Sequence, residues 1–216
     1  MNLGLDFGIE LGFYLGMGMF TESSFMRRFV IGVTGASGIP LAVSLLRDMR
    51  CLGLETHLII SRAALRVISE EGKLTADDLS ALADFTYEPD DVAAPMASGS
   101  WRHGGMVICP CSMSSLGHIA NGNGINLIHR AADVCLKEKR ILVLVPRETP
   151  LSLIHIRNML AAAEAGAVIF PPNPSFYHNP QSLDDLLVQM SGRILDCLGQ
   201  NSAISRWGEP EKSARA

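Results

Sequence analysis

The chain has little charge and few aromatic residues: of its 216 residues, 19% are charged and 6% are aromatic, whereas 48% are hydrophobic. So high a hydrophobic content excludes an intrinsically disordered chain. The 18 lysines and arginines are outnumbered by 22 acidic residues, for a formal net charge of −4. The chain therefore lacks the basic excess of a general nucleic-acid-binding protein, and we predict no nucleic-acid partner.

Cysteine is also scarce, with five residues and no paired CxxC motif. This odd count excludes a secreted disulfide framework and a zinc ribbon, so we predict no metal and a cytoplasmic location. The longest suspicious apolar run, Leu11–Phe20, is shorter than the roughly 20 residues of a membrane span. It follows Asp6 and Glu10, where a signal peptide carries basic residues, so we predict no membrane span.

The length predicts one domain with additions, because it is only about 1.4 times a typical domain of roughly 150 residues. Strand-like sequence begins directly after Met26 and Arg27. We therefore predict an N-terminal extension over residues 1–26 that lies outside the fold, a single domain over 27–200, and a polar C-terminal tail over 201–216.

Apolar strand-like runs alternate with amphipathic helical segments along the predicted domain. Such alternation predicts an α/β fold with a doubly wound parallel sheet between two helical layers, of the Rossmann-like and flavodoxin-like kind. The predicted strands are Phe29–Thr34, Glu55–Ile60, Met106–Pro110, Ile141–Val145 and Ala167–Phe170. The predicted helices are Pro40–Leu52, Ala63–Glu71, Thr75–Ala83, Ser114–Ala120, Leu127–Lys139, Leu151–Ala165 and Ser182–Leu198.

Small, hydroxylated or charged residues follow the predicted strands, at the edge where ligands bind in such sheets. Glycines and hydroxyls at helix starts suit a nucleotide phosphate, although they suit tight turns and helix caps as well, and both interpretations stay open here. The residues concerned are Gly35, Ala36, Ser37, Ser61, Ser112, Met113, Ser114, Ser115 and Arg147.

The glycine turn does not match the common nucleotide motifs. A dinucleotide site needs GxGxxG and an acidic residue about 20 positions later, but the second strand is followed by Ser61. The TGASGI run is typical of short-chain dehydrogenases, but no tyrosine precedes a lysine by four residues. No GxxxxGK[ST] run occurs either, so NAD and a P-loop are disfavoured.

A second group of residues is basic and lies outside the turns. Arg130 and Lys137 are seven residues apart on one predicted helix, hence on nearly the same face, and with Arg147, Arg193 and Tyr177 they are candidates for holding a second anion. Two acidic residues, Glu71 and Glu148, are the best placed for proton transfer nearby.

Several motifs occur in order over about residues 28–199: TGASG, ISRAA, CPCSMSSL, RAADVCLKE, VPRETPL, FYH and PQS. Together they resemble the UbiX-type flavin prenyltransferases, once described as aromatic-acid decarboxylases. The resemblance implies a homododecameric flavoprotein that transfers a dimethylallyl group from dimethylallyl monophosphate to N5 and C6 of reduced FMN, without a metal. The product is prenylated FMN, the cofactor of UbiD-type decarboxylases.

The resemblance also implies roles for individual residues. Gly35, Ala36, Ser37, Ser61, Ser112–Ser115 and Arg147 correspond to FMN contacts, and Arg130, Lys137, Tyr177 and Arg193 to ligands of the donor phosphate, some reaching across a subunit interface. Glu148 corresponds to the acid that protonates the leaving phosphate, and Glu71 with Ser37 to a proton relay near N5 and C6.

Two other functions remain alternatives. One is an FMN-dependent cysteine decarboxylase of the phosphopantothenoylcysteine type, which would need an active-site histidine early in the chain, whereas His57 lies within a predicted strand. The other is a non-catalytic flavin carrier, which would not need an acid and a base. These residues do not decide the length of the prenyl donor or whether it is a monophosphate or a pyrophosphate. They also do not decide whether the pathway served is ubiquinone synthesis or aromatic-acid degradation.

Overall fold

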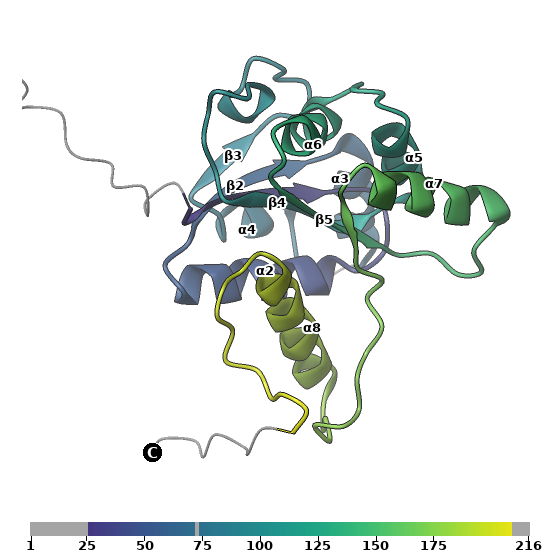
Figure 1. The fold of residues 1–216 in the computed structure, drawn as a ribbon. Coiled ribbons are helices and arrows are strands. Elements are labelled where there is room, and N and C mark those ends of the chain that lie inside the picture. The colour runs from purple at the N-terminus through teal and green to yellow at the C-terminus, as the bar shows by residue number, and fades with distance from the viewer. Residues whose placement is uncertain (1–25, 72–73, 209–216) are drawn as a thin grey trace, which may run out of the picture.

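A parallel sheet of six strands forms the centre of the computed structural model, which describes residues 26–71 and 74–208. Its strand order is β3-β2-β1-β4-β5-β6, and helices cover both faces (Figure 1). The predicted α/β fold with a doubly wound sheet between two helical layers is therefore confirmed. The strands are β1 Arg28–Val33, β2 Glu55–Ile60, β3 Phe85–Tyr87, β4 Gly105–Cys111, β5 Ile141–Pro146 and β6 Val168–Ile169.

The helices lie close to their predicted ranges, and their observed ends differ from the predicted ones by a few residues. They are α2 Ile39–Cys51, α3 Arg62–Glu71, α4 Ala76–Ser80, the 3-10 helix η1 Pro95–Ala97, α5 Met113–Ala120, α6 Leu127–Lys137, α7 Leu153–Glu164 and α8 Leu183–Cys197. Hydroxyl side chains set several starts: Thr75, Ser152 and Ser182 each form a capping box at the first turn of α4, α7 and α8.

The prediction of five strands was wrong by one, because β3 was missed. This strand has three residues and pairs with β2 at the edge of the sheet, with Phe85 opposite His57. Two of its residues are exposed. Three residues are too few for an alternation of apolar and polar residues to be recognised as a strand.

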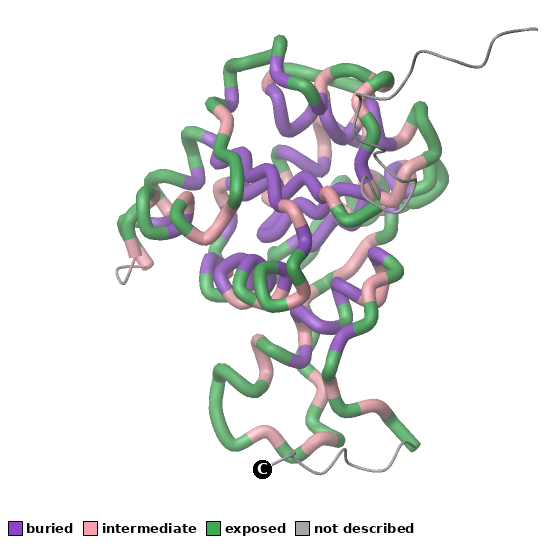
Figure 2. Tube along the Cα trace, turned by 90° about the vertical axis from the view of Figure 1, so that its left-hand side faces the viewer, coloured by how far each residue is buried: buried purple, intermediate pink, exposed green. Residues whose placement is uncertain are grey.

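Strand side chains alternate between two apolar clusters, one on each face of the sheet. Phe29, Ile31 and Val33 pack with residues of α2 and α8, whereas Val30 packs on the other face with residues of α5 and α6. The buried positions accordingly gather in the middle of the molecule (Figure 2). Both faces of the central strands are covered, as expected for a parallel sheet.

The strand order places a topological switch between β1 and β4. From β1 the chain continues through β2 to the β3 edge, and from β4 it continues through β5 to the β6 edge. Connections after β1 and β4 therefore leave the sheet in opposite directions and open a crevice at the carboxyl ends of these two strands, where doubly wound folds bind ligands.

The segment after α8 packs back onto that helix. Ser202 is buried, and Ile204 lies over Gly192 of α8. Residues 201–208 of the predicted polar tail thus contact the domain, whereas the predicted extension over residues 1–26 lies outside the described residues except for Met26. Within the described ranges, no helix combines the length and apolar character needed to cross a bilayer.

His129 is a buried histidine without a polar partner for its ring. Its side chain lies at the start of α6 and stacks on His118 of α5 with ring centroids 5.0 Å apart. Neither ring nitrogen has a hydrogen-bond partner in the described part of the chain. Burial first, and the nearby His118 second, lower the pKa of His129 from 6.5 to about 4.

Replacing Gly35 with alanine is expected to lower the free energy of unfolding by about 1–3 kcal/mol, because the core there has no room for another methyl group. A Cβ at Gly35 would lie 2.6 Å from Cβ of Ala63 in α3, too close for two carbon atoms. Gly124→Ala is the control, since its Cβ would meet nothing nearer than 3.9 Å. Urea unfolding checks the prediction, and equal midpoints for both variants would contradict it.

The free energy of unfolding is expected to fall as the pH drops from about 6.5 towards about 4. His129 contributes up to about 1.4 kcal/mol of this loss per pH unit. The unfolded chain binds this proton more readily than the folded one, because the folded pKa is the lower of the two. His103, whose pKa burial also lowers to about 4, adds to the same slope. His129→Leu is expected to flatten the difference in denaturant midpoint between pH 5 and pH 8, and an unchanged difference would refute the prediction.

Candidate active site

Thr34 joins the ends of the two strands that flank the switch point. Its hydroxyl donates to the carbonyl oxygen of Pro110 at 2.8 Å and accepts the N–H of Ser112 at 2.7 Å, while its own N–H donates to the same carbonyl at 3.1 Å. The side chain is 1% exposed. The glycine turn after β1 is thereby held against the serine segment after β4.

Glu71 caps the helix that follows the glycine turn. Gly38, with φ of 122°, brings the chain into α2, and the Glu71 carboxylate at the end of α3 accepts the N–H groups of Gly38 at 3.0 Å and Ile39 at 3.1 Å. A carboxylate suits the positive end of the helix dipole. The start of α2 is thus occupied by a side chain of the protein, and the start of α5 is the more open position for an anion.

A cleft of about 480 Å³ opens above these strand ends. Eight of the predicted site residues line it, and they come from the ends of β1, β4 and β5 and from α3. The lining residues are Gly35, Ala36, Ser37, Arg66, Val67, Glu70, Glu71, Ser112, Met113, Arg147 and Glu148.

Arg147 links the third strand end to the glycine turn. Its Nε donates to the carbonyl oxygen of Ser37 at 3.2 Å, and its remaining guanidinium donors are left for other partners. Glu148 follows in the chain and accepts the N–H of Thr149 at 2.9 Å. A fixed cation and an exposed carboxylate therefore stand side by side at the rim of the cleft.

A second, largely apolar cavity of about 420 Å³ adjoins the cleft. It shares Ser37, Glu71 and Arg147 with the cleft, so the two spaces meet at these three side chains. The rest of its wall comes from the start of α2, α8, the ends of β4 and β5 and the loop after β6, namely Gly38, Pro40, Leu41, Pro110, Val145, Pro172, Leu183, Leu187 and Met190.

Two of the predicted cofactor hydroxyls act as helix caps. Ser61 accepts the N–H of Ala64 at 3.2 Å at the start of α3, and Ser112 accepts the N–H of Ser115 at 3.2 Å at the start of α5. The capping interpretation that the sequence left open is therefore correct for these serines. Ser61, Ser114 and Ser115 do not line the cleft, whereas Ser112 both caps α5 and lines it.

The four predicted ligands of the donor phosphate do not line either cavity within one chain. Each has a partner elsewhere: Arg130 pairs with Asp133, Lys137 with Glu138, Arg193 with Asp196, and Tyr177 accepts a hydrogen bond from Gln189. Lys137 ends α6 shortly before β5 begins, so it lies at the amino end of the sheet, opposite the cleft.

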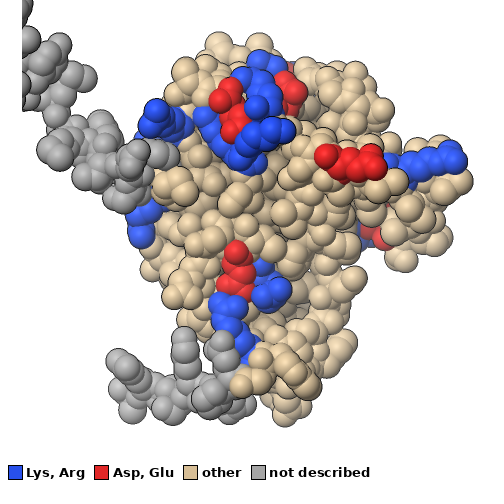
Figure 3. All heavy atoms as spheres, viewed as in Figure 1, with Lys and Arg blue, Asp and Glu red and all other residues tan. Residues whose placement is uncertain are grey.

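Charged side chains on the face shown in Figure 3 form small groups of both signs separated by uncharged surface. No large patch of one sign is visible on this face.

The sequence predicts Thr34 only as a strand-end residue, without a bonding role, and it does not predict the α3 residues Arg66, Val67 and Glu70 as part of the site. The signal for the α3 residues was present, because Val67 precedes Glu71 by four positions and the two lie on the same helical face. Thr34 had no comparable signal, since a hydroxyl at the end of a strand gives no indication of which neighbouring strand it will bond.

The chain is similar in sequence to proteins of known family. The family model described as Flavoprotein matches residues 21–192. The flavin prenyltransferase UbiX of Deinococcus radiodurans is 50% identical over 185 residues, covering 85% of this chain and 95% of the relative. The chain belongs to the UbiX family of flavin prenyltransferases.

Two solved UbiX-family structures have the same fold. The structure of AnUbiX (PadA1) in complex with FMN and dimethylallyl pyrophosphate is 47% identical, with a TM-score of 0.83 over 86% of this chain and 99% of its own. A dodecameric FMN-dependent UbiX-like decarboxylase from Escherichia coli O157:H7 is 46% identical, with a TM-score of 0.81 over 84% of this chain and 100% of its own.

Replacing Glu71 with alanine is expected to lower the free energy of unfolding by about 1–2 kcal/mol, because the N–H groups of Gly38 and Ile39 lose their acceptor. Glu71→Gln keeps one acceptor oxygen and is expected to lose about half as much. Thermal unfolding of both variants measures the difference. Equal loss in the two would show that the carboxylate does not act as the cap of α2.

Proposed function

We propose that this chain is a flavin prenyltransferase that joins the dimethylallyl group of dimethylallyl monophosphate to N5 and C6 of reduced FMN. The observation that carries the proposal is the meeting of a polar cleft and an apolar cavity at Ser37, Glu71 and Arg147. A flavin in the cleft and a five-carbon chain in the cavity would meet at this junction. No histidine or cysteine lines either space among the described residues.

The residues of the cleft fit FMN. The N–H groups of Met113 and Ser114 precede the first hydrogen bond of α5, and such helix starts bind phosphate. Arg147 adds a cation beside them, and Gly35 and Ala36 allow close approach of the ring system. We assign Gly35, Ala36, Ser37 and Ser112–Ser115 with Arg147 to FMN, and Ser61 to support of the adjacent turn.

When bound, reduced FMN supplies the nucleophilic nitrogen and carbon of the reaction. In the proposed mechanism Glu148 donates a proton to the departing phosphate as the allylic C–O bond breaks and its electron pair moves to oxygen. Fixed cations stabilise that oxygen more in the transition state than in the ground state. Glu71, next to Ser37 at the junction, takes up the proton displaced from the ring nitrogen, passes it to the remaining double bond of the five-carbon chain, and then accepts the proton that the ring carbon loses as the second bond forms.

Neighbouring copies of the chain would complete the donor site. Arg130, Lys137, Tyr177 and Arg193 do not reach the cleft of their own chain, so we propose that some of them serve the cleft of a neighbour. Exposed apolar side chains on α7, namely Leu153, Ile154, Ile156 and Leu160, offer a surface for such contacts. A homododecamer, as in the Escherichia coli relative, is the proposed assembly.

A cysteine decarboxylase is less well supported because no histidine is available for it in the cleft. His57 is 4% exposed and bonds to Glu55 at 2.7 Å and Tyr87 at 3.0 Å, in the amino-terminal half of β2. Burial lowers the pKa of this histidine, which keeps it neutral. A non-catalytic flavin carrier would not account for Glu71 and Glu148 on either side of the junction.

We propose a UbiD-type decarboxylase as the recipient of the product and the cytoplasm as the location. Free thiols support a reducing compartment: all five cysteines of the chain are unpaired, and burial raises the pKa values of Cys111 and Cys135 to about 12.

Anaerobic incubation of the chain with reduced FMN and dimethylallyl monophosphate tests the proposal. Mass spectrometry of the extracted flavin is expected to show the addition of a single five-carbon unit. Tightly bound but unmodified FMN would refute prenyl transfer and favour the carrier.

Glu148→Gln and Lys137→Ala are each expected to lower the turnover rate by about 10²- to 10⁴-fold while FMN stays bound. The first loses the proton donor and the second a cation at the phosphate. Lys139→Gln, which removes an exposed cation two residues away, is the matched control. Flavin fluorescence measures FMN binding, and full turnover in either variant would remove that residue from the mechanism.

A further inference from the structure

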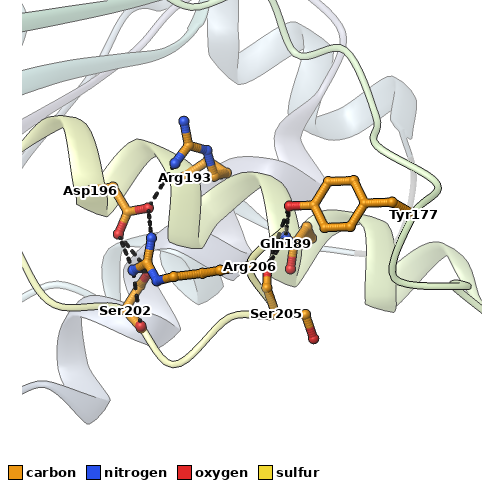
Figure 4. Close-up of polar contacts among 7 residues, drawn as sticks. All are labelled: Tyr177, Gln189, Arg193, Asp196, Ser202, Ser205 and Arg206. Atoms are coloured by element: carbon orange, nitrogen blue, oxygen red, sulfur yellow. Dashed lines mark hydrogen bonds and ion pairs between the residues drawn. The ribbon is translucent and has the colours of Figure 1, made fainter. Parts of the chain in front are cut away.

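Asp196 on α8 lies between two arginines (Figure 4). Arg206, in the segment after α8, binds both carboxylate oxygens, from Nη1 to Oδ2 and from Nη2 to Oδ1, each at 2.8 Å. Arg193 makes one bond to Oδ2 at 3.1 Å, and Ser202 donates to Oδ1 at 2.8 Å. The Asp196 side chain is 17% exposed, whereas that of Arg193 is 53% exposed.

The charges of this cluster do not cancel. Both guanidinium groups are always protonated, so two positive charges face one carboxylate and leave a net charge of +1. Partial burial alone would raise the pKa of Asp196, but hydrogen bonds from Arg206 and Ser202 and the charge of both arginines hold it below its usual range. The carboxylate therefore stays ionised, and its bidentate ion pair with Arg206 is stronger than its single bond to Arg193.

Arg193 is the partner that keeps spare donors. It uses one of its five N–H groups on Asp196, and its side chain is half in solvent. It lies one turn of α8 beyond Met190, which lines the apolar cavity. An anionic group bound near that end of the cavity would meet the free part of the Arg193 guanidinium.

The same C-terminal segment also holds Tyr177. The Tyr177 hydroxyl accepts the side-chain amide of Gln189 at 3.1 Å and donates to the carbonyl oxygen of Ser205 at 3.4 Å (Figure 4). Gln189 also donates to that carbonyl at 2.8 Å, and the ring of Trp207 lies edge-on to the tyrosine with centroids 5.5 Å apart. Ser205 and Trp207, on either side of Arg206, thus contact Tyr177, another predicted phosphate ligand, which lies in the loop before α8.

We propose that Arg206 is a positioning residue for the prenyl donor: by binding both oxygens of Asp196, it leaves Arg193 with positive charge available for the donor phosphate. This proposal rests on the proposed function for the identity of the donor. Arg206 lies beyond residue 192, where the match to the family model ends. It touches neither the donor nor FMN, and acts through the charge of Asp196 alone.

Substitutions that change the net charge of this cluster in opposite directions test the proposal. Arg206→Gln leaves Asp196 to neutralise Arg193 and is expected to raise the Michaelis constant for dimethylallyl monophosphate about fivefold or more, with kcat and FMN affinity unchanged. Asp196→Asn raises the net charge and is expected to lower that constant. The double variant keeps the charge of Arg193 alone and is expected to return close to the wild-type value, and Arg206→Lys is expected to recover part of the loss.

A purely structural role for Arg206 gives a different pattern. If the ion pair only anchored the C-terminal segment, then Asp196→Asn would be as defective as Arg206→Gln, and the double variant would stay defective. The salt dependence of the Michaelis constant also distinguishes the positioning role of Arg206 from a purely structural one. Salt screens the attraction of the phosphate, so the Michaelis constant of the wild type is expected to rise more steeply with salt than that of Arg206→Gln.

Binding of inorganic phosphate to the FMN-loaded chain separates this proposal from the proposed function. Calorimetry is expected to show weaker binding in Arg206→Gln, stronger binding in Asp196→Asn and near wild-type binding in the double variant. This pattern in a chain that does not modify FMN would uphold the role of Arg206 and refute prenyl transfer. Equal phosphate affinity in all four chains would refute the role of Arg206, whether or not FMN is prenylated.

Discussion

A single buried threonine ties together the two strands on which the site depends. Thr34 ends the first strand, and its hydroxyl both donates to and accepts from the backbone at the end of β4. At 1% exposure it makes these bonds away from water, where a polar group that lost its partner would be costly. The glycine turn and the serine segment therefore have one relative position, and the cleft between them is formed before any ligand arrives.

Two charged side chains extend this arrangement to the rest of the site. Glu71 reaches from the end of α3 to the start of α2, and Arg147 reaches from the end of β5 to the carbonyl of Ser37. Both are used in the fold and both line the junction of the two cavities. Their positions are thus set by backbone groups rather than by a ligand, which is the condition for stabilising charge without reorganisation during a reaction.

The folded chain presents a complete cleft and an incomplete donor site. The groups that face the cleft come from the ends of three strands, the start of α5 and the C-terminal half of α3, whereas the basic residues of α6 and α8 are paired with local carboxylates. Exposed apolar residues on α7 indicate where another copy would pack. Under the proposed function, association of chains would bring these basic residues to the cleft of a neighbour.

The sequence by itself determined the order of most strands and helices, because apolar runs such as Ile141–Val145 and the 3.6-residue period of segments such as Leu127–Lys137 are local and strong. It also indicated the glycine and serine turns, the acids Glu71 and Glu148, and the family. Only the tertiary structure decided that Thr34 bonds to the end of β4, that β3 completes the sheet and that Arg206 binds Asp196. Each of these depends on contacts between segments far apart in the chain, and residue type and spacing do not specify which partner a hydroxyl or a charge will meet.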